Sequence, residues 1–436
     1  MPKTISEYGI IRKSSDYEST KDTFSEIFLL DSSFELLKKY CFEQANDAVF
    51  QYSIKRGREQ VQVKNHVGLI QLKDRTQIEI LPKVLSINPS LSGEGHGVGL
   101  SRCIFLKMLR CVPNLPFQKL SFSQIDTQRN LPIYDIFLLA FLDEVEQLLA
   151  RGLNKFYHTQ TDNQKYVRGK VLVGENIRQN SFQIEQIFTE LDEFVANTPA
   201  NRILKKAILL ADNQTNNAKI KRKSKNLLRA FDDVADVENV KIEFDKINFQ
   251  NRYLKHYETA LQWSKILLQN HSFSPFAGGN SGISLLFPAE QLFEAYIAYG
   301  FKRFADDSEV LVQKSEQFLI ENHLEKPKFR LIPDIIVQNQ DLRILIDTKW
   351  KLINGRSTHK NYGIEQSDLY QMYAYGKKYQ SGNLCLIYPA NEQFSEPLEV
   401  FDYESDMKLL VIPFDIANDL SAEIQQIISR MTYLCK

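Results

Sequence analysis

Two acidic residues and a lysine occur in a pair of apolar, β-branched segments. The first segment, Leu331–Val337, contains Asp334, and the second, 342–351, contains Asp347 and Lys349. Such segments predict strands, and the short polar stretch between them predicts a turn, so we expect a β-hairpin. Asp334 should share the face of its apolar neighbours, and Asp347 should share a face with Lys349. Charges among core residues are costly unless they are paired or bind a metal.

Two carboxylates and an ammonium group at neighbouring strand ends are suited to divalent-metal chemistry. Mg²⁺ prefers carboxylate oxygens, waters and substrate phosphate, and it lowers the pKa of a bound water. The lysine would hold or deprotonate that water and neutralise developing charge. A structural Asp–Lys ion pair at a strand end is equally consistent with the two segments alone.

The chain order of these residues resembles a known nuclease signature. Pro333-Asp334 followed by Asp347-Thr348-Lys349 is similar to the PD-(D/E)xK motif. The resemblance implies a magnesium-dependent endodeoxyribonuclease that cleaves phosphodiesters and leaves a 5′-phosphate. It implies Mg²⁺ bound by Asp334 and Asp347, with the Thr348 carbonyl as an added ligand. It also implies that Lys349 positions the attacking water.

Flanking residues extend this resemblance to the RecB-like branch of the superfamily. Gln371 and Tyr375 are similar to its QxxxY motif and lie one turn apart on a predicted helix. Glu294, on the predicted helix Ala289–Phe304, is similar to a further acid of that branch. The resemblance implies a metal-proximal role for Glu294 and a DNA-contacting or bracing role for Gln371. An exposed helix acid at Glu294 and a core tyrosine at Tyr375 remain open alternatives.

The amino-acid sequences of several segments resemble those of the McrC family, the nuclease subunit of McrBC restriction systems. These segments are 347–351, 368–375, 78–83 and 168–170. The resemblance implies a separate McrB-like AAA+ GTPase hexamer that docks on the N-terminal region. It implies a double-stranded DNA substrate carrying methylated or otherwise modified bases. Two alternatives stay open: an inactive nuclease-fold subunit that regulates or assembles the NTPase, and a stand-alone DNA-repair nuclease.

The glycine-rich segment Gly93–Gly99 does not predict a nucleotide site. No Gly-Lys-Ser/Thr follows it, so the lysine and the hydroxyl that grip phosphates and magnesium are missing. We expect a flexible loop there. The nucleotide, GTP by resemblance, is therefore expected on the partner and not on this chain.

The composition is that of an ordinary globular protein. A formal net charge of zero excludes a uniformly basic nucleic-acid coat but allows a local basic channel. The five cysteines are scattered without a CxxC pair, which favours reduced thiols and the cytoplasm. The chain starts without an apolar signal segment and contains no apolar run long enough for a membrane span.

At 436 residues the chain is expected to form two or three domains. We predict an α+β and α/β multidomain fold in three regions. Residues 1–165 form a β-rich and helical partner-docking region, and 166–274 a mostly helical middle region. Residues 275–436 form the PD-(D/E)xK domain, with a restriction-endonuclease-like α/β core.

Three segments between these landmarks carry predictions of their own. Residues 156–166 are polar and predicted to be irregular, whereas 191–268 is predicted to be mostly helical, with Thr198 as a helix cap before Pro199. The basic cluster 219–225 would either track a DNA backbone or form a solvated helix face.

Overall fold

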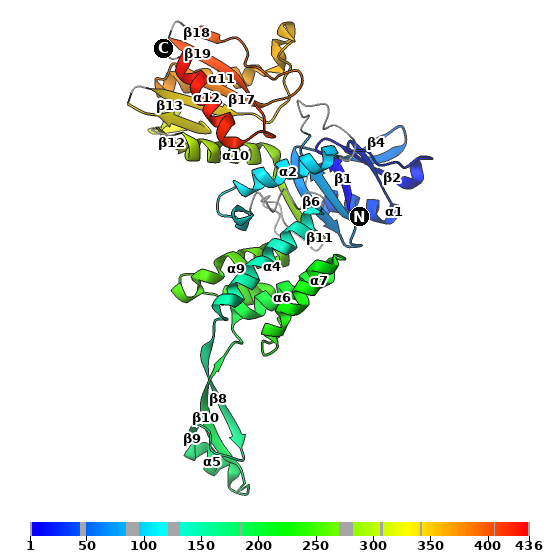
Figure 1. Ribbon diagram of the computed structural model, residues 1–436, viewed down its shortest axis with the longest axis vertical. Helices are drawn as coiled ribbons and strands as arrows, with labels where there is room; N and C mark the ends of the chain where they lie inside the picture. Colours follow the sequence, from blue (N-terminus) through cyan, green and yellow to red (C-terminus); the bar gives the residue numbers. More distant parts are fainter. Residues whose placement is uncertain are drawn as a thin grey trace. The chain divides into compact units, whose positions relative to one another are not determined.

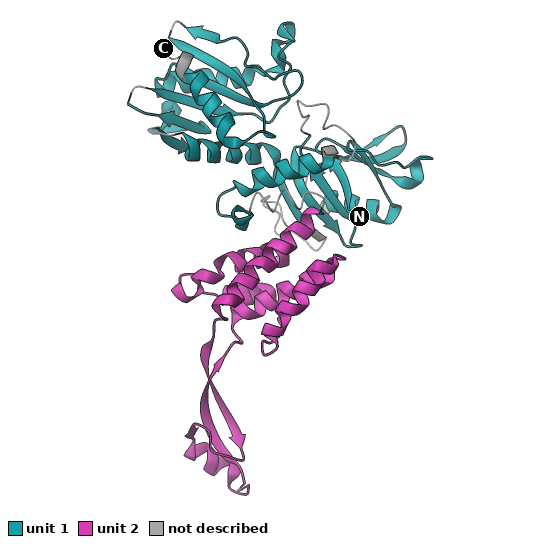
Figure 2. Ribbon diagram, in the orientation of Figure 1, with its two compact units in different colours: residues 1–131, 272–436 teal, residues 132–271 magenta. Residues whose placement is uncertain are grey.

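The computed structural model describes residues 2–43, 49–83, 96–120, 131–183, 185–269, 282–305, 308–340, 342–404 and 406–434. The chain forms two compact units, shown in Figure 2. Unit 1 combines residues 1–131 and 272–436, and unit 2 comprises residues 132–271. The prediction of a mixed α and β chain is confirmed, because each unit contains both sheets and helices (Figure 1).

Two sheets in the N-terminal part of unit 1 confirm the β-rich character expected there. Their strands are β1 (Lys3–Ser6), β2 (Ile10–Lys13), β3 (Glu26–Leu29), β4 (Phe50–Lys55), β5 (Arg58–Val63), β6 (His66–Leu72), β7 (Gln77–Leu81) and β11 (Gly282–Pro288). The first sheet has the order β1-β7-β6-β11 and the second the order β3-β2-β5-β4. The first sheet is thus completed by β11, a strand from far along the chain.

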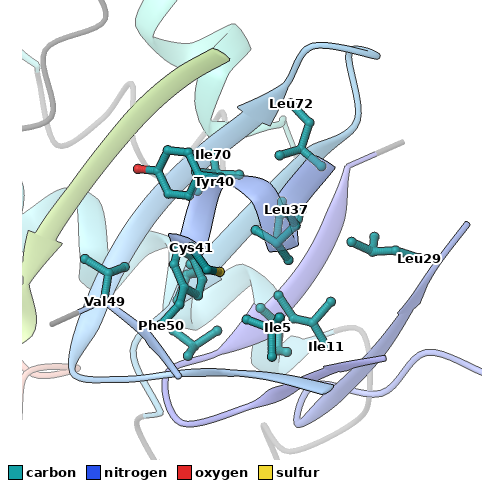
Figure 3. Close-up of a cluster of buried hydrophobic side chains, with 14 of the residues drawn as sticks. Ile5, Ile11, Leu29, Leu37, Tyr40, Cys41, Val49, Phe50, Ile70 and Leu72 are labelled. Atoms are coloured by element: carbon teal, nitrogen blue, oxygen red, sulfur yellow. The ribbon is translucent and has the colours of Figure 1, made fainter. Parts of the chain in front are cut away.

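A helix between β3 and β4 supplies much of the core of these sheets. Helix α1 (Asp31–Glu43) buries Phe34, Leu37 and Tyr40 against strand residues such as Ile11 and Ile70 (Figure 3). Apolar residues recur at every second position along the strands and about every 3.6 positions along the helix. Their side chains pack together here in one cluster. Two helices follow the sheets: α2 (His96–Arg110) and the 3₁₀ helix η3 (Pro116–Lys119).

The C-terminal part of unit 1 is built on a six-stranded sheet of order β12-β15-β16-β17-β19-β18. Its strands are β12 (Glu309–Val312), β15 (Ile335–Gln338), β16 (Arg343–Thr348), β17 (Asn383–Pro389), β18 (Phe401–Glu404) and β19 (Met407–Phe414). The central strands β16, β17 and β19 are parallel, and the outer pairs are antiparallel. A separate two-stranded sheet joins β13 (Gln317–His323) to β14 (Lys326–Leu331).

Helices cover both faces of the central strands. The helices here are α10 (Ala289–Phe304), α11 (Gln366–Tyr379), α12 (Leu420–Leu434) and the 3₁₀ helix η6 (Thr358–Gly363). Helix α11 packs Met372 and Tyr375 onto a core that includes Leu345 and Leu386. Alternate residues Ile346 and Ile387 are also buried, and α10 and α12 pack against strands of the sheet. Burial on both faces explains why the parallel strands are continuously apolar.

Unit 2 consists of a helical bundle and an arm. The helices are α4 (Ile133–Arg151), α6 (Pro199–Gln214), α7 (Ala218–Leu228), η4 (Arg229–Phe231), α8 (Val240–Asp245), η5 (Arg252–Tyr257) and α9 (Glu258–Gln269). The predicted cap is confirmed, since the Thr198 side chain accepts a hydrogen bond from the Asn201 backbone N–H at 3.2 Å. The arm contains β8 (Phe156–Gln164), β9 (Lys170–Val171), α5 (Val173–Asn180) and β10 (Ile187–Val195).

The arm corrects two predictions. The segment 156–166 is not irregular, because β8 pairs with β10 in continuous antiparallel register from Phe156↔Val195 to Gln164↔Ile187. The same pairing makes 191–195 a strand and not the start of a helical region. Most β8 side chains are exposed on this ribbon, so no buried face imposes the apolar alternation by which a strand is recognised in sequence.

Two loop predictions are also modified. Residues 93–95 of the glycine-rich segment lie outside the described residues, but Gly97 and Gly99 belong to α2 and not to a loop. Most of the loop expected over 271–284 also lies outside them, whereas its last residues belong to β11. Among the described helices, none is both long and apolar enough to span a membrane.

Candidate active site

The predicted hairpin is formed by β15 and β16. Their register pairs Ile335 with Ile346, so Asp334 lies opposite Asp347 at the end of the ladder. The first arm is shorter than predicted, since Asp334 precedes β15. Ile332 is 42% exposed, so it does not share a buried face with Asp334 as expected. Pro333 accounts for this, because it lacks the N–H that a continued ladder requires.

Asp334 is held by the opposite strand end. Its Oδ2 accepts hydrogen bonds from the backbone N–H of Thr348 at 2.7 Å and from the Thr348 hydroxyl at 2.8 Å. Burial and the nearby charge of Glu294 nevertheless raise the pKa of Asp334 to about 6. The carboxylate is therefore oriented but not neutralised by its own hydrogen bonds.

Asp347 is the most enclosed acid of the site, with 2% of its side chain exposed. Its Oδ1 accepts a hydrogen bond from Gln371 Nε2 at 3.3 Å. Its Oδ2 lies 2.7 Å from Lys349 Nζ but accepts no well-aligned hydrogen bond. Burial and the charge of Asp334 raise the pKa of Asp347 to about 7. The ammonium of Lys349 is thus the cation that offsets the charge of this buried oxygen.

Lys349 is the cation that these carboxylates share. Its Nζ donates to Gln371 Oε1 at 3.0 Å and lies 3.8 Å from Asp368 Oδ1. Burial acts to lower the pKa of Lys349, but the charge of Asp347 and further acids raise it above its usual range. The surrounding acids therefore favour the charged ammonium form of Lys349 in this arrangement.

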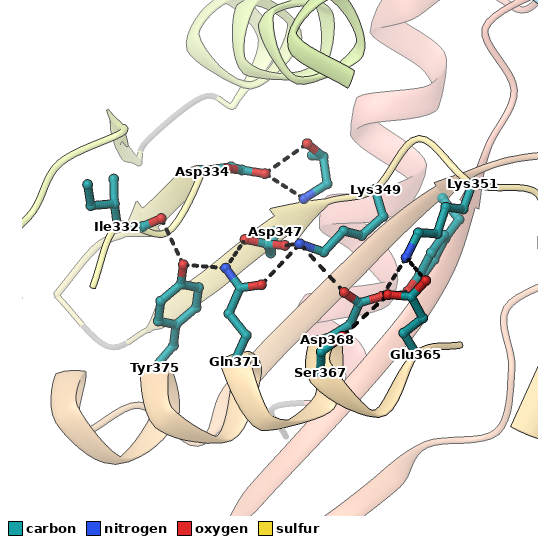
Figure 4. Close-up of polar contacts among 12 residues, drawn as sticks. Ile332, Asp334, Asp347, Lys349, Lys351, Glu365, Ser367, Asp368, Gln371 and Tyr375 are labelled. Carbon is teal, nitrogen blue, oxygen red and sulfur yellow. Dashed lines mark hydrogen bonds and ion pairs between the residues drawn. The ribbon is translucent and has the colours of Figure 1, made fainter. Parts of the chain in front are cut away.

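Helix α11 supplies the residues that brace this pair. Figure 4 shows Asp368, Gln371 and Tyr375 pointing from one helix toward Asp347 and Lys349. Gln371 Nε2 also donates to the Tyr375 hydroxyl at 2.7 Å, and that hydroxyl donates to the Ile332 carbonyl at 2.8 Å. The one-turn spacing of Gln371 and Tyr375 places both side chains on the face that meets the sheet.

The donor set partly resembles a magnesium site. Among the described residues, no group of three or more His, Cys, Asp and Glu side chains lies together as a metal cage. Mg²⁺ does not require one, because it is usually held by one or two carboxylates together with waters and substrate phosphate. The two buried carboxylates of Asp334 and Asp347, whose pKa values are raised to about 6 and about 7, fit such a partial site.

A family model described as "McrBC 5-methylcytosine restriction system component" matches residues 61–389. This chain belongs to the McrBC family. The matched range contains Glu294, Asp334, Asp347, Lys349 and Gln371, so all of the geometry above lies within the family region. The predicted family membership is thereby confirmed.

One solved structure has the same fold over nearly the whole McrBC-family chain. A chain of the half-complex of Thermococcus gammatolerans McrB AAA+ hexamers with bound McrC is 16% identical, with a TM-score of 0.72. The alignment covers 99% of this chain and 100% of that one. The Thermococcus gammatolerans McrBC complex gives 20% identity and a TM-score of 0.49, over 70% and 88% of the two chains. No curated protein matches this chain.

Glu294 of the McrBC-family chain lies close enough to the two aspartates for their charges to interact. It comes from α10, and its Oε1 accepts a hydrogen bond from Gln313 Nε2 at 2.6 Å. Burial and the charge of Asp347 raise the pKa of Glu294. It is therefore not the fully exposed helix acid of the alternative interpretation.

Asp368 is a site residue that the sequence interpretation did not select. It is 6% exposed, lies 3.8 Å from both Lys349 Nζ and Lys351 Nζ, and accepts a hydrogen bond from the Tyr388 hydroxyl at 3.2 Å. One signal was present in the sequence: Asp368 precedes Gln371 by three residues and therefore shares its helix face. The contact with Lys351 required the tertiary structure.

Proposed function

We propose that this McrBC-family chain is the magnesium-dependent endonuclease subunit of a modification-dependent restriction system. The observation that carries the proposal is the buried Asp347 carboxylate, which faces both Asp334 and the Lys349 ammonium at the end of one hairpin. The order of these residues along the chain supports a PD-(D/E)xK core. Perturbed acids with a specific charged neighbour are typical of functional sites.

Asp334, Asp347 and the Thr348 carbonyl are the proposed magnesium ligands. When bound, Mg²⁺ would activate a water and neutralise charge on the phosphodiester. The Lys349 ammonium would stabilise negative charge on the phosphate and orient the attacking water. Gln371 would hold the Asp347 and Lys349 side chains in place relative to each other, because its amide contacts both of them. Glu294 would hold a further water or a second metal ion, and the cleaved strand would carry a 5′-phosphate.

The proposed partner is an McrB-like AAA+ GTPase hexamer, as in the solved complex with bound McrC. Docking is proposed for residues 1–165, which include β8 of the arm. Within this range the arm exposes Tyr157 at 71%, and beyond it, just after α5, Phe182 is exposed at 99%; exposed apolar groups of this kind mark interaction surfaces. The GTP site belongs to the partner in this proposal.

Double-stranded DNA with 5-methylcytosine or a similar modified base is the proposed substrate. The basic cluster 219–225 lies on α7, where Lys223 is already paired with Asp143 at 2.5 Å and Glu146 at 2.6 Å. A DNA contact at this helix would therefore depend on the remaining basic residues of the cluster.

Cleavage assays on purified protein test the proposal. Asp347→Asn and Lys349→Ala should abolish magnesium-dependent cleavage of a methylated duplex in the presence of the partner and GTP, while partner binding is retained. Asp402→Asn changes an exposed acid of β18 in the same sheet and should cleave normally. Undiminished cleavage by both site variants would remove the assignment.

The same assays separate the two alternatives. An inactive regulatory subunit predicts that the unmodified chain cleaves under no condition, although it binds the partner. A stand-alone repair nuclease predicts cleavage without partner or nucleotide.

A further inference from the structure

Glu7 is a buried carboxylate next to β1 in the N-terminal part of unit 1. Its side chain is 3% exposed, and its backbone N–H donates to the Leu81 carbonyl of β7 at 2.9 Å. Burial raises the pKa of Glu7, whereas hydrogen bonds from Lys83 and Trp350 act to lower it. Because a buried charge is costly without donors, the ionised form of Glu7 depends on these contacts.

One of these contacts comes from the end of the hairpin of the candidate site. The indole Nε1 of Trp350 lies 3.0 Å from Glu7 Oε1 and 2.9 Å from Oε2, so one N–H is shared by both oxygens. The backbone N–H of Lys83 donates to Oε1 at 3.0 Å. The other side of the indole packs on Phe293, with ring centroids 5.1 Å apart. Trp350 is therefore held by a polar contact on one side and an aromatic contact on the other.

Trp350 separates the two lysines of the site. Lys349 Nζ lies 2.7 Å from Asp347 Oδ2, and both Lys349 and Lys351 lie 3.8 Å from Asp368. Because Trp350 lies between Lys349 and Lys351 in the chain, the position of its backbone determines where both lysine side chains begin. Long lysine side chains lose much rotamer freedom when they are held in one geometry, so a fixed starting point favours the aligned state.

The contact between Glu7 and Trp350 is not enclosed on every side. A pocket of about 400 Å³ adjoins it and is lined by Glu7, Tyr8, Trp350, Lys351 and other residues. The indole thus has space for other orientations once the hydrogen bond to Glu7 is removed. Its observed orientation is therefore maintained by Glu7 and not by close packing alone.

We propose that Glu7 is a positioning residue for the nuclease site and acts through Trp350 on Lys349. The inference rests on the proposed nuclease function and adds a residue of the N-terminal sheet to it. A positioning role predicts loss of turnover with little change in magnesium or DNA binding. The hydrogen bonds of Glu7 are to Lys83 and Trp350, and Glu7 contacts none of the residues proposed to bind magnesium.

The test uses the full chain with its AAA+ partner, GTP, Mg²⁺ and a duplex carrying 5-methylcytosine. The variants are Glu7→Ala, Glu7→Gln and Trp350→Phe, the last of which keeps a ring against Phe293 but removes the N–H. Glu423→Gln is the matched control, because Glu423 is a buried carboxylate of α12 that accepts hydrogen bonds from Asp415 and Asn418, outside both the proposed docking region and the candidate site. The readouts are kcat, KM for DNA, the magnesium midpoint, the thermal midpoint and partner binding.

We expect Glu7→Ala and Trp350→Phe to lower kcat about tenfold, with KM for DNA and the magnesium midpoint unchanged. Glu7→Gln should recover part of the loss, because its amide oxygen still accepts from the indole. The Glu7→Ala and Trp350→Phe changes combined should cost no more than either alone, since both remove one contact. The control should match the unmodified chain.

Unchanged kcat in folded Glu7→Ala and Trp350→Phe proteins would overturn the inference. A rise in KM at unchanged kcat would also overturn it, because it would indicate a role in DNA binding. Absence of magnesium-dependent cleavage by the unmodified chain would instead reject the proposed function on which the inference rests.

Discussion

At the scale of single residues, the site places like charges close together. The negative charges of Asp334 and Asp347 repel each other, so ionising both carboxyl groups is costly. The positive charge of Lys349 offsets only part of that cost. Such repulsion destabilises the folded chain at neutral pH until a cation binds. The destabilisation is measurable and can be separated from catalysis.

Asp347→Asn is expected to stabilise the metal-free protein at pH 8. The pKa of Asp347 is about 7 in the folded chain, compared with 3.8 for the unperturbed group, so the folded state holds a proton that the unfolded state releases. The unmodified protein therefore loses stability as pH rises from about 4 through 7. The variant should gain about 1–2 kcal/mol at pH 8 and nothing at pH 4. Thermal or urea unfolding at both pH values measures this.

In the presence of Mg²⁺, the unmodified chain should become more stable than the Asp347→Asn variant. A ligand that binds only the folded state stabilises it, so Mg²⁺ should raise the thermal midpoint of the unmodified chain and leave that of Asp347→Asn nearly constant. Equal shifts in both proteins would contradict magnesium binding at Asp347. EDTA should restore the original midpoints.

Asp368→Asn should reduce cleavage by about tenfold without unfolding the protein. The change removes the second counter-charge of Lys349 and also one of the groups that hold Lys351. Among the described residues, Lys349 then keeps only Asp347, and Lys351 only Glu365, as its acidic partner, so both ammonium groups are held less firmly. Single-turnover cleavage measures the effect, with Asp402→Asn as the control. A rate equal to that of the control would show that Asp368 is dispensable.

At the scale of elements, the β6–β11 pair joins the N-terminal sheet to the strand that leads into α10. Gly68 of β6 has φ +139°, and a Cβ there would lie 2.0 Å from the Leu285 carbonyl oxygen. Only glycine allows β11 to approach this closely. Because α10 carries Glu294 and Phe293, this pair also supports the edge of the candidate site.

Gly68→Ala is therefore expected to destabilise unit 1 by more than about 1 kcal/mol. Gly99→Ala is the matched control, since Gly99 lies within α2 and a Cβ there meets no atom within 4 Å. The control should be neutral or slightly stabilising, because alanine favours helix. Urea unfolding distinguishes the two, and equal midpoints would show that β11 accommodates the methyl group.

At the scale of the whole molecule, each unit is proposed to have its own task. Unit 1 contains the candidate site, and unit 2 contains an arm that exposes large apolar side chains, among them Tyr157 and Phe182. An arm of this kind gains most from burial against a partner. The partner proposed for this arm is the McrB-like AAA+ hexamer.

Combining Tyr157→Ser with Phe182→Ser should weaken the complex with the AAA+ partner about tenfold or more. Both side chains are exposed in the isolated chain, so the fold should not change. Tyr253→Ser removes a similarly exposed ring, 65% accessible, from the helical part of unit 2 and serves as the control. Size-exclusion chromatography with GTP measures complex formation. An intact complex would place docking on the N-terminal sheets instead.

Local sequence patterns determined several of the helices and strands of this protein. The bounds of α10 and α11 and the existence of the β15–β16 hairpin were predictable, because they depend on apolar periodicity and turn residues within a short window. The sequence also predicted that Asp347, Lys349 and Gln371 would come together, through their resemblance to a nuclease motif.

Only the tertiary structure decided the contacts that join distant segments. The arm strands, the pairing of β6 with β11, the approach of Asp368 to Lys351 and the bond between Glu7 and Trp350 leave no local signature. Each depends on packing between segments far apart in the sequence, where the free energy comes from burial and pairing and not from the preference of a single residue.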